Sequence, residues 1–525
     1  MPKNLHIFNF DGTGNEPEDA NQEVKYKAKK EDDNISNVLK LHLMMGGNLY
    51  QKGSQYGSST RKDIENCFYY KGVGTYGGWL SRIVNQGVAL EGCDVASIMN
   101  KAINDFKTAY KKGDTVIISG FSRGAALARR FVTLVDQITA SNKPKPFVFL
   151  CVFDTVACIG IPNLNKSNRP DYDVVFENGC TLSNIVVQAA HMLSLDDKRS
   201  AFQPTLMNKD PERITEIWFA GAHSDVGGGY YRDGLSDIAL GYAMKWLHFM
   251  SKKPGLSRYL PAIKLRIPDD EALKNACPDK LKGMIGVDDL QRNPDPMAKN
   301  HQQDRWPVLD WLTLDDRVFC VIDQDKIDAN AQPILHWSVA VRLHRDSNYR
   351  PKSVANVKHR VWYDFSNPCV DSVGLNEHIH RPLNNWQVLN IGEQAVKTIE
   401  ADALYNYTGI MMEKNSKYKI TAESTGQWYD ATIDCGADGW TRASESLGLK
   451  EAFIAAAEPF RRVSKANWFQ LCGSIGSSDE NAKKIGCSGT FIAGKSGEFT
   501  AFANDLESKY GNNSGSIEIT IKRVV

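Results

Sequence analysis

A run of β-branched residues breaks abruptly into Gly-Phe-Ser-Arg-Gly at residues 120–124, and small residues at helical spacing follow. This pattern predicts a strand, a sharp turn and a helix, with Ser122 at the turn. Such a turn strains the serine backbone, and small neighbours such as Gly120 and Gly124 avoid a clash there. The first N–H groups of the helix would face a developing oxyanion. Ser122 is therefore a candidate nucleophile; the alternative is an ordinary strand–helix turn with an exposed serine.

A serine nucleophile needs a base and an acid that orients the base. The apolar run 146–153 predicts a buried parallel strand that ends at Asp154, and the run 214–222 predicts a further strand that ends at His223. In α/β-hydrolases the acid and the base follow the serine in this order, on loops at the carboxyl ends of later strands. Asp154 and His223 are thus the candidate acid and base.

The oxyanion needs N–H donors from two places in the chain. Arg123 follows the serine directly, and its backbone N–H is the first candidate. The second lies in the glycine-rich turn after the first predicted strand, where Gly12 or Thr13 would donate. The side chain of Asp11 would instead order that turn.

Other residues compete for these roles. Asp154 is also suited to capping a turn, and a lone histidine after a strand, such as His223, is often a structural residue. Asp225 is close enough to His223 to be a rival acid. His191, inside a segment that we predict as a helix over 185–195, is a rival base. His378 and His380 have the spacing of a metal pair but lack a further ligand in the sequence, which favours a surface loop.

Strands alternate with helical segments through residue 249, which predicts an α/β fold with an α/β-hydrolase-like, doubly wound parallel sheet. Residues 252–390 are rich in Pro, Asp, Lys and Trp with weak periodicity, and we expect a cap of loops and short helices there. Short alternating runs between turns predict an antiparallel β-sandwich over 403–525. The boundary falls near 395–402, so the predicted domains are 1–395 and 403–525.

Composition excludes several classes of protein. The formal net charge of the 525 residues is +1, so no global field attracts nucleic acid. The 11 cysteines form no Cys-x-x-Cys pair, which argues against zinc. The N-terminus lacks the apolar core of a secretory signal. We expect synthesis in the cytoplasm and, if the protein is secreted, a route without a cleavable signal.

Five short motifs follow one another in the first half of the chain, at residues 10–15, 72–75, 120–125, 153–156 and 223–230. Together they resemble the α/β-hydrolase family that contains the phospholipase effectors of type VI secretion. The resemblance implies a triad of Ser122, Asp154 and His223 and an activity of the phospholipase A type. It also implies a secreted antibacterial effector that acts at the envelope of a target cell. Its partners would be membrane phospholipid, a component of the secretion spike and an immunity protein.

The loop at residues 504–516 concentrates oxygen donors of the kind that hard cations prefer. The alternative is a solvated hairpin loop. The order of residues is similar to that of the calcium-dependent galactose-binding lectins of the PA-I type. This resemblance implies one Ca²⁺, with carbonyl oxygens contributed by the backbone, and its implied ligands are Asp505, Asn512, Asn513, Lys509 and Tyr429. We expect metal binding to be retained more readily than galactose specificity.

These observations predict a serine ester hydrolase of the phospholipase type, with no cofactor for catalysis and Ca²⁺ in the C-terminal domain. Two alternatives stay open. One is a carboxylesterase acting on small or carbohydrate-linked esters. The other is a calcium-dependent glycan-binding protein whose hydrolase scaffold is inert.

Overall fold

The structure is a computed structural model, and the residues that it describes are 4–20, 33–73, 91–157, 179–199, 202–263, 265–301, 315–346, 349–362, 365, 370–373, 387–423, 427–445, 448, 451–476, 479, 482–506, 509–510 and 513–525. The chain divides into two compact units. The first comprises Met1–Asp289 and Pro296–His380, and the second comprises Leu290–Asp295 and Arg381–Val525. Gly74, Thr75, His378, His380 and Asn512, which the sequence singles out, lie outside the described residues.

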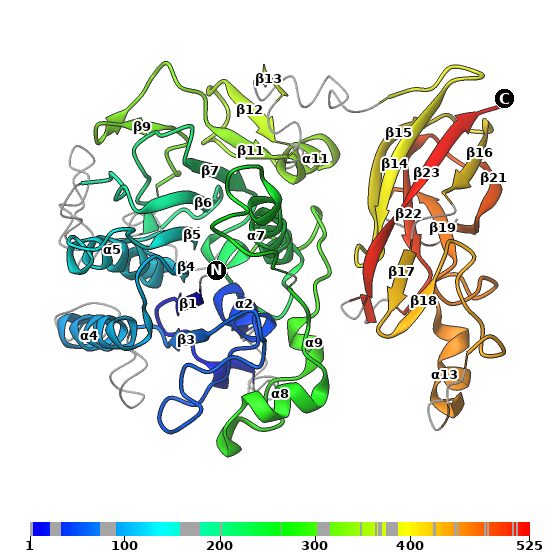
Figure 1. Cartoon of the computed structure of the whole chain (residues 1–525). Helices are drawn as coiled ribbons and strands as arrows, with labels where there is room; N and C mark the ends of the chain where they lie inside the picture. The colour runs from blue at the N-terminus through cyan, green and yellow to red at the C-terminus, as the bar shows by residue number, and fades with distance from the viewer. Residues whose placement is uncertain are drawn as a thin grey trace, which may run out of the picture. The chain divides into compact units, whose positions relative to one another are not determined.

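A nine-stranded sheet forms the centre of the first unit, in the order β13-β12-β11-β7-β6-β5-β4-β1-β3 (Figure 1). Eight of these strands are parallel, and β13 at the edge is antiparallel to β12. The predicted α/β class is therefore confirmed. The strands are β1 (Leu5–Phe10), β3 (Asn66–Tyr70), β4 (Thr115–Phe121), β5 (Phe147–Phe153), β6 (Val186–Ser194), β7 (Ile214–Phe219), β11 (Ile334–His336), β12 (His359–Trp362) and β13 (Val370–Val373).

Helices α4 (Glu91–Ala109) and α5 (Ser122–Ile138) lie together beside the sheet, and α2 (Asn37–Met44) and α7 (Gly234–Lys252) lie on the opposite side of the strands (Figure 1). Phe131 of α5 and Phe106 of α4 pack with Phe8 of β1 in one buried cluster. The unit also contains η1 (Pro17–Ala20), β2 (Asp33–Ser36), α6 (His223–Gly227), β8 (Gly228–Tyr230), α8 (Asp270–Ala276), η3 (Asp279–Leu281), α9 (Val287–Leu290), β9 (Ile322–Asp323), β10 (Lys326–Ile327) and α11 (Trp337–Arg345).

The order of the strands places a topological switch point beside β1. The chain passes from β1 to β3 on one side, and then returns across β1 to β4 on the other. At the carboxyl end of β1, Phe10 is paired with Tyr70 of β3 and with Gly120 of β4. The loops after β1 and β4 therefore leave the same edge of the sheet side by side, where α/β sheets bind their ligands.

Two predictions of local structure are wrong. The segment predicted as a helix over 185–195 is the buried strand β6, because a short, mostly apolar run fits either period. The segment predicted as a cap over 252–390 contributes β11, β12 and β13 to the main sheet. These strands have only three or four residues each, so their periodicity is too brief to be seen in the sequence.

The second unit contains two antiparallel sheets, as the alternating pattern predicts. One has the order β18-β17-β23-β16-β21 with β14 also paired to β23, and the other has the order β15-β22-β19-β20. Trp428, Phe469 and Ile519 are among the side chains of its buried core. The elements are β14 (Gln394–Glu400), β15 (Asn406–Met412), β16 (Lys417–Ala422), β17 (Gln427–Asp430), β18 (Ile433–Cys435), α13 (Glu451–Ala457), η5 (Glu458–Phe460), β19 (Leu471–Ile475), β20 (Lys483–Lys484), β21 (Ser488–Ile492), β22 (Gly497–Ala503) and β23 (Asn513–Arg523).

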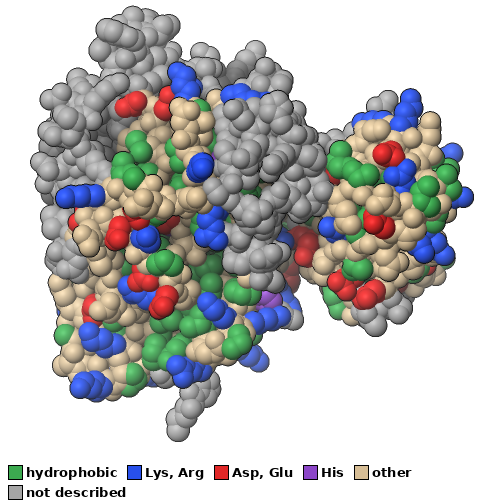
Figure 2. Space-filling view, turned by 90° about the horizontal axis from the view of Figure 1, so that it is seen from above, with side chains coloured by type: hydrophobic (Ala, Val, Ile, Leu, Met, Phe, Trp, Pro, Cys, Tyr) green, Lys and Arg blue, Asp and Glu red, His purple; other side chains and the backbone are tan. Residues whose placement is uncertain are grey.

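On the face of the molecule shown in Figure 2, basic and acidic side chains are interspersed among the described residues. The described charged side chains on this face are therefore not separated into one large patch of a single sign. Among the helices of the described residues, none has the length and apolar character needed to cross a bilayer.

Candidate active site

Ser122 lies at the sharp turn that the sequence predicts. β4 ends at Phe121 and α5 begins at Ser122, whose φ of 57° lies in the left-handed region that favours glycine. A β-carbon on Gly120 would lie 2.7 Å from the Cα of Ala125, and one on Gly124 would lie 2.2 Å from the carbonyl oxygen of Asp11. Both glycines are therefore needed for the tight packing of the turn, as in a nucleophile elbow.

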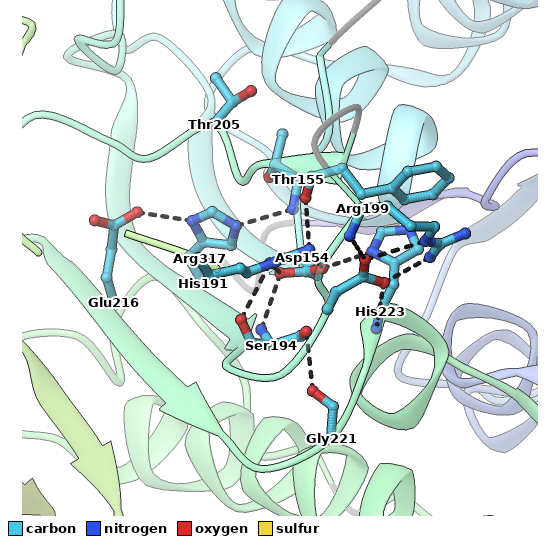
Figure 3. Close-up of polar contacts among 12 residues, drawn as sticks. Asp154, Thr155, His191, Ser194, Arg199, Thr205, Glu216, Gly221, His223 and Arg317 are labelled. Atoms are coloured by element: carbon cyan, nitrogen blue, oxygen red, sulfur yellow. Dashed lines mark hydrogen bonds and ion pairs between the residues drawn. The ribbon is translucent and has the colours of Figure 1, made fainter. Parts of the chain in front are cut away.

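Asp154 and His223 are in direct contact (Figure 3). His223 Nδ1 lies 2.5 Å from Asp154 Oδ2, and both side chains are buried. Asp154 directly follows β5 with a φ of 41°, and His223 begins α6 shortly after β7. One further strand, β6, separates β5 from β7 in the chain and in the sheet, which the sequence analysis did not recognise.

The His223 ring is oriented with its second nitrogen available as a base. Because an ionised carboxylate only accepts hydrogen bonds, Nδ1 carries the proton, and the Nε2 lone pair is the basic site. Nε2 is buried and has no hydrogen-bond partner among the described residues. The ring packs against Phe121, which precedes Ser122, at a centroid distance of 4.6 Å. Burial lowers the pKa of His223 below its usual value, and the contact with Asp154 opposes this shift.

Arg317 completes the surroundings of Asp154, and the sequence analysis missed it. Its Nη1 donates to Asp154 Oδ1 at 2.6 Å, and its Nη2 donates to Oδ2 at 2.9 Å. Burial raises the pKa of the Asp154 carboxyl, but the charge of Arg317 and the contact with His223 outweigh it, so the pKa lies below its usual value. No local pattern marks this arginine, which follows two aspartates in the segment predicted as a cap.

The rival residues have other partners. His191 Nε2 accepts from the backbone N–H of Thr155 at 3.1 Å, and its Nδ1 lies 2.7 Å from Glu216, so both ring nitrogens are occupied (Figure 3). His191 therefore fixes the backbone beside Asp154 and has no nitrogen left to act as a base. Asp225 lies 2.6 Å from Nδ1 of His301, with which it forms a separate buried pair.

The loop after β1 lies against the elbow, as expected for an oxyanion donor. Asp11 orders this loop: its Oδ1 accepts from the Gly12 N–H at 2.7 Å, and its Oδ2 accepts from the Tyr69 hydroxyl at 2.5 Å. The Gly12 N–H is therefore already donated to Asp11, and of the two predicted oxyanion donors we retain the backbone N–H of Thr13. Arg123 Nε donates to the Thr13 hydroxyl, which ties the loop to the first turn of α5. Burial raises the pKa of Asp11 to about 6.

Buried oxygens without partners mark the region in the second unit where the sequence predicts a cation. Asp505 Oδ2 and Asn513 Oδ1 are buried and have no hydrogen-bond partner among the described residues. Asn513 of β23 is paired with Asp430 of β17, the strand that also carries Tyr429. Burial, and after it the charge of Asp430, raise the pKa of Asp505 to about 7. The unsatisfied oxygens of Asp505 and Asn513, together with the nearby carboxyl of Asp430, are a donor set that fits a hard cation.

Other predicted ligands are less informative. Lys509 is exposed, and its backbone N–H donates to the carbonyl of Leu506 at 3.0 Å. Within the ranges that the structure describes, no group of three or more His, Cys, Asp or Glu side chains is arranged to hold a metal. A cation here would therefore depend on amide and carbonyl oxygens as well as on carboxylates.

The chain was compared with solved structures and with curated proteins. No curated protein matches it. An uncharacterized protein from Pseudomonas aeruginosa is 16% identical with a TM-score of 0.30, and the match covers 55% of this chain and about half (49%) of that protein. The PllA-like lectin of the EclA N-terminal domain is 18% identical with a TM-score of 0.17, over 24% of this chain and 94% of that domain.

A family model matches the part of the chain that contains the elbow, Asp154 and His223. Its description is the catalytic domain of the Tle1-like phospholipase effectors of the type VI secretion system (T6SS), and the matched residues are 3–145 and 137–246. Arg317 lies beyond the matched residues. Residues 3–246 of this chain are therefore similar to the catalytic domain of these phospholipase effectors.

Proposed function

We propose that this protein is a serine hydrolase that cleaves carboxylic esters of phospholipids, as an antibacterial effector delivered to the envelope of a target cell. The single observation that carries the proposal is the state of His223. Its Nδ1 is fixed by Asp154, its Nε2 is buried without a partner, and its ring lies against the residue before Ser122. Nε2 makes no hydrogen bond to Ser122 in this structure, and in the proposed reaction it accepts the proton of the serine hydroxyl.

In the proposed reaction, Ser122 Oγ attacks the ester carbonyl carbon while His223 Nε2 accepts its proton. The backbone N–H groups of Arg123 and Thr13 would stabilise the oxyanion. The tetrahedral intermediate then expels the lysophospholipid alcohol, which takes the proton from His223, and leaves an acyl ester on Ser122. Water attacks this ester with His223 again as the base, which releases the fatty acid and restores the serine.

Product analysis on mixed phospholipid vesicles tests this function. We expect the full chain to release fatty acid and lysophospholipid in equal amounts, because one ester is cleaved in each turnover. We also expect a fluorophosphonate probe to label Ser122, as detected by mass spectrometry of peptides. Cleavage of short-chain esters without release of fatty acid from vesicles would favour a carboxylesterase. Calcium-dependent glycan binding without any ester cleavage would favour a glycan-binding protein with an inert hydrolase scaffold. Release of a phosphorylated headgroup would contradict the proposed bond specificity.

We further propose that the second unit binds one Ca²⁺ through the side chains of Asp505, Asn512 and Asn513, with carbonyl oxygens of Lys509 and Tyr429. The support is the pair of buried oxygens on Asp505 and Asn513 that have no partner among the described residues. A bound cation would satisfy both. Its role would be to shape a surface that binds a glycan or a delivery partner, and galactose specificity is not required for this.

Calcium should stabilise the second unit. At a free concentration of 100 times Kd, a ligand that binds only the folded state adds about 2.7 kcal/mol. We expect the thermal unfolding transition of this unit to rise with Ca²⁺ and to fall with a chelator, and Asp505→Asn should abolish the response. Glu518→Gln, an exposed change on β23, is the matched control and should keep it. An equal response in Asp505→Asn would exclude the proposed ligands.

A further inference from the structure

Arg317 donates to both oxygens of the Asp154 carboxylate, including Oδ2, which also contacts His223 Nδ1. Besides the two contacts with Asp154, its Nη1 donates to the carbonyl of Ser194 at 3.1 Å and its Nη2 donates to the carbonyl of Phe202 at 2.6 Å. The side chains of Arg317 and Asp154 are both 0% exposed. The guanidinium is thus fixed by three parts of the chain, and its fork meets both carboxylate oxygens (Figure 3).

The carboxylate of Asp154 is fully occupied by donors. Oδ1 accepts from the backbone N–H of Ser194 at 2.9 Å and from Arg317, and Oδ2 accepts from Arg317 and from His223 Nδ1. With two donors on each oxygen, the carboxylate cannot rotate without losing several of them. The direction in which Oδ2 faces His223 is therefore set largely by Arg317.

Arg317 also changes the charge that the imidazole experiences. A buried carboxylate alone would strongly favour protonation of the adjacent histidine, whereas a carboxylate paired with a guanidinium is neutral as a unit. The other charged groups that face His223 are Asp197 and Arg199, and these pair with each other at 2.6 Å. Asp197 Oδ2 also accepts from the backbone N–H of His223 at 3.1 Å. His223 is therefore surrounded by two internally neutralised ion pairs.

We propose that Arg317 is a positioning residue of the proposed ester-hydrolysis site, which orients Asp154 toward His223 and keeps His223 neutral, and so active as a base, in mildly acidic surroundings. This inference rests on the proposed function for its catalytic meaning. It adds a residue from beyond the segment that matches the effector family, and one that donates to Asp154, Ser194 and Phe202 rather than to Ser122. The alternative is an ion pair that only attaches the 315–319 segment to the sheet.

Three variants separate these roles. Arg317→Met removes both the positive charge and the two parallel hydrogen bonds to Asp154. Arg317→Lys keeps the charge but cannot form both hydrogen bonds. Arg342→Met is the control. Arg342 is a buried arginine of α11 whose Nη1 donates to the carbonyls of Pro296 and Ala298 rather than to Asp154. All three proteins are checked by circular dichroism and thermal unfolding before kinetics on phospholipid vesicles.

We expect Arg317→Met to lower kcat by about 10²-fold with little change in KM, because a misdirected base costs roughly that much. The acidic limb of the profile of kcat/KM against pH should move to higher pH by about one unit, since the carboxylate is no longer neutralised and favours the imidazolium. In Arg317→Lys, the acidic limb of the pH profile should stay within a few tenths of a pH unit of its wild-type position. Its kcat should be about tenfold below that of wild type. Arg342→Met should reduce stability without moving the limb.

A titration that does not need turnover keeps the inference separate from the proposed function. In Ser122→Ala protein with ¹³C-labelled histidine, NMR follows the protonation of His223 directly, and Arg317→Met should raise its midpoint by about one pH unit. If this shift is found but no ester is cleaved, the proposed function fails and the positioning contact stands. An unchanged midpoint and limb in folded Arg317→Met protein would overturn the inference and leave a structural ion pair.

Discussion

Ser122→Ala is expected to lower kcat for phospholipid hydrolysis by about 10⁴- to 10⁶-fold, because no other group can form the acyl intermediate. The side chain is buried at 5% exposure, and alanine fills the same space without a polar group that needs a partner. The backbone at this position keeps its φ of 57° in either case, so the free energy of unfolding should change little. Fatty acid release from vesicles measures the effect.

The control is Ser251→Ala, a buried serine at the end of α7 whose hydroxyl donates to the carbonyl of His248 at 2.7 Å. It should keep its activity within about twofold, since it lies outside the proposed site. If Ser122→Ala folds and retains more than a tenth of the wild-type rate, then Ser122 is not the nucleophile. In that case the elbow would be an ordinary tight turn between β4 and α5.

Asp154→Asn should show two large effects at once. The rate should fall by about 10⁴-fold, because an amide stabilises the wrong tautomer of His223 and cannot support the imidazolium. The free energy of unfolding should fall by about 3–5 kcal/mol, because the buried guanidinium of Arg317 loses its counter-charge. Urea unfolding and vesicle kinetics on the same protein measure the two effects.

The matched control is Asp114→Asn, which breaks another buried Asp–His contact, the one of 2.9 Å with His6 Nε2. Asp114 immediately precedes β4, at the opposite end of the strand from Ser122. This variant should lose stability while its kcat stays within about tenfold of wild type. Equal losses of kcat in the two variants would mean that Asp154 acts only through stability.

The turn at Ser122, together with Asp154 and His223, could be predicted from the sequence because each follows a long buried strand. β4 and β5 have seven residues each, with enough β-branched and aromatic side chains to be recognised. Asp154 and His223 then follow from the rule that ligands gather at the carboxyl ends of parallel strands. The structure places Asp154 and His223 in contact, and their catalytic roles remain predictions.

The rest of the site could not be predicted from the sequence because it depends on contacts between segments that are far apart in the chain. Arg317 belongs to a polar stretch without periodicity, and its pairing with Asp154 spans 163 residues. The sequence of β6 includes Ala189, Ala190 and Met192, which suit a helix as well as a strand, and only its neighbours β5 and β7 make it a strand. For the same reason, His191 was predicted on a helix, whereas it lies on β6.

Asp154 and its counter-charge Arg317 are 163 residues apart in the sequence, which has a consequence for biosynthesis. The ribosome synthesises the chain from its N-terminus, so the segments that contain Ser122, Asp154 and His223 emerge well before Arg317 does. Until then the carboxylate of Asp154 lacks two of its four donors, and its burial in the finished sheet is opposed by the cost of desolvation. The nascent chain therefore acquires its finished acid–base pair late, after a continuous length of more than 300 residues has been made.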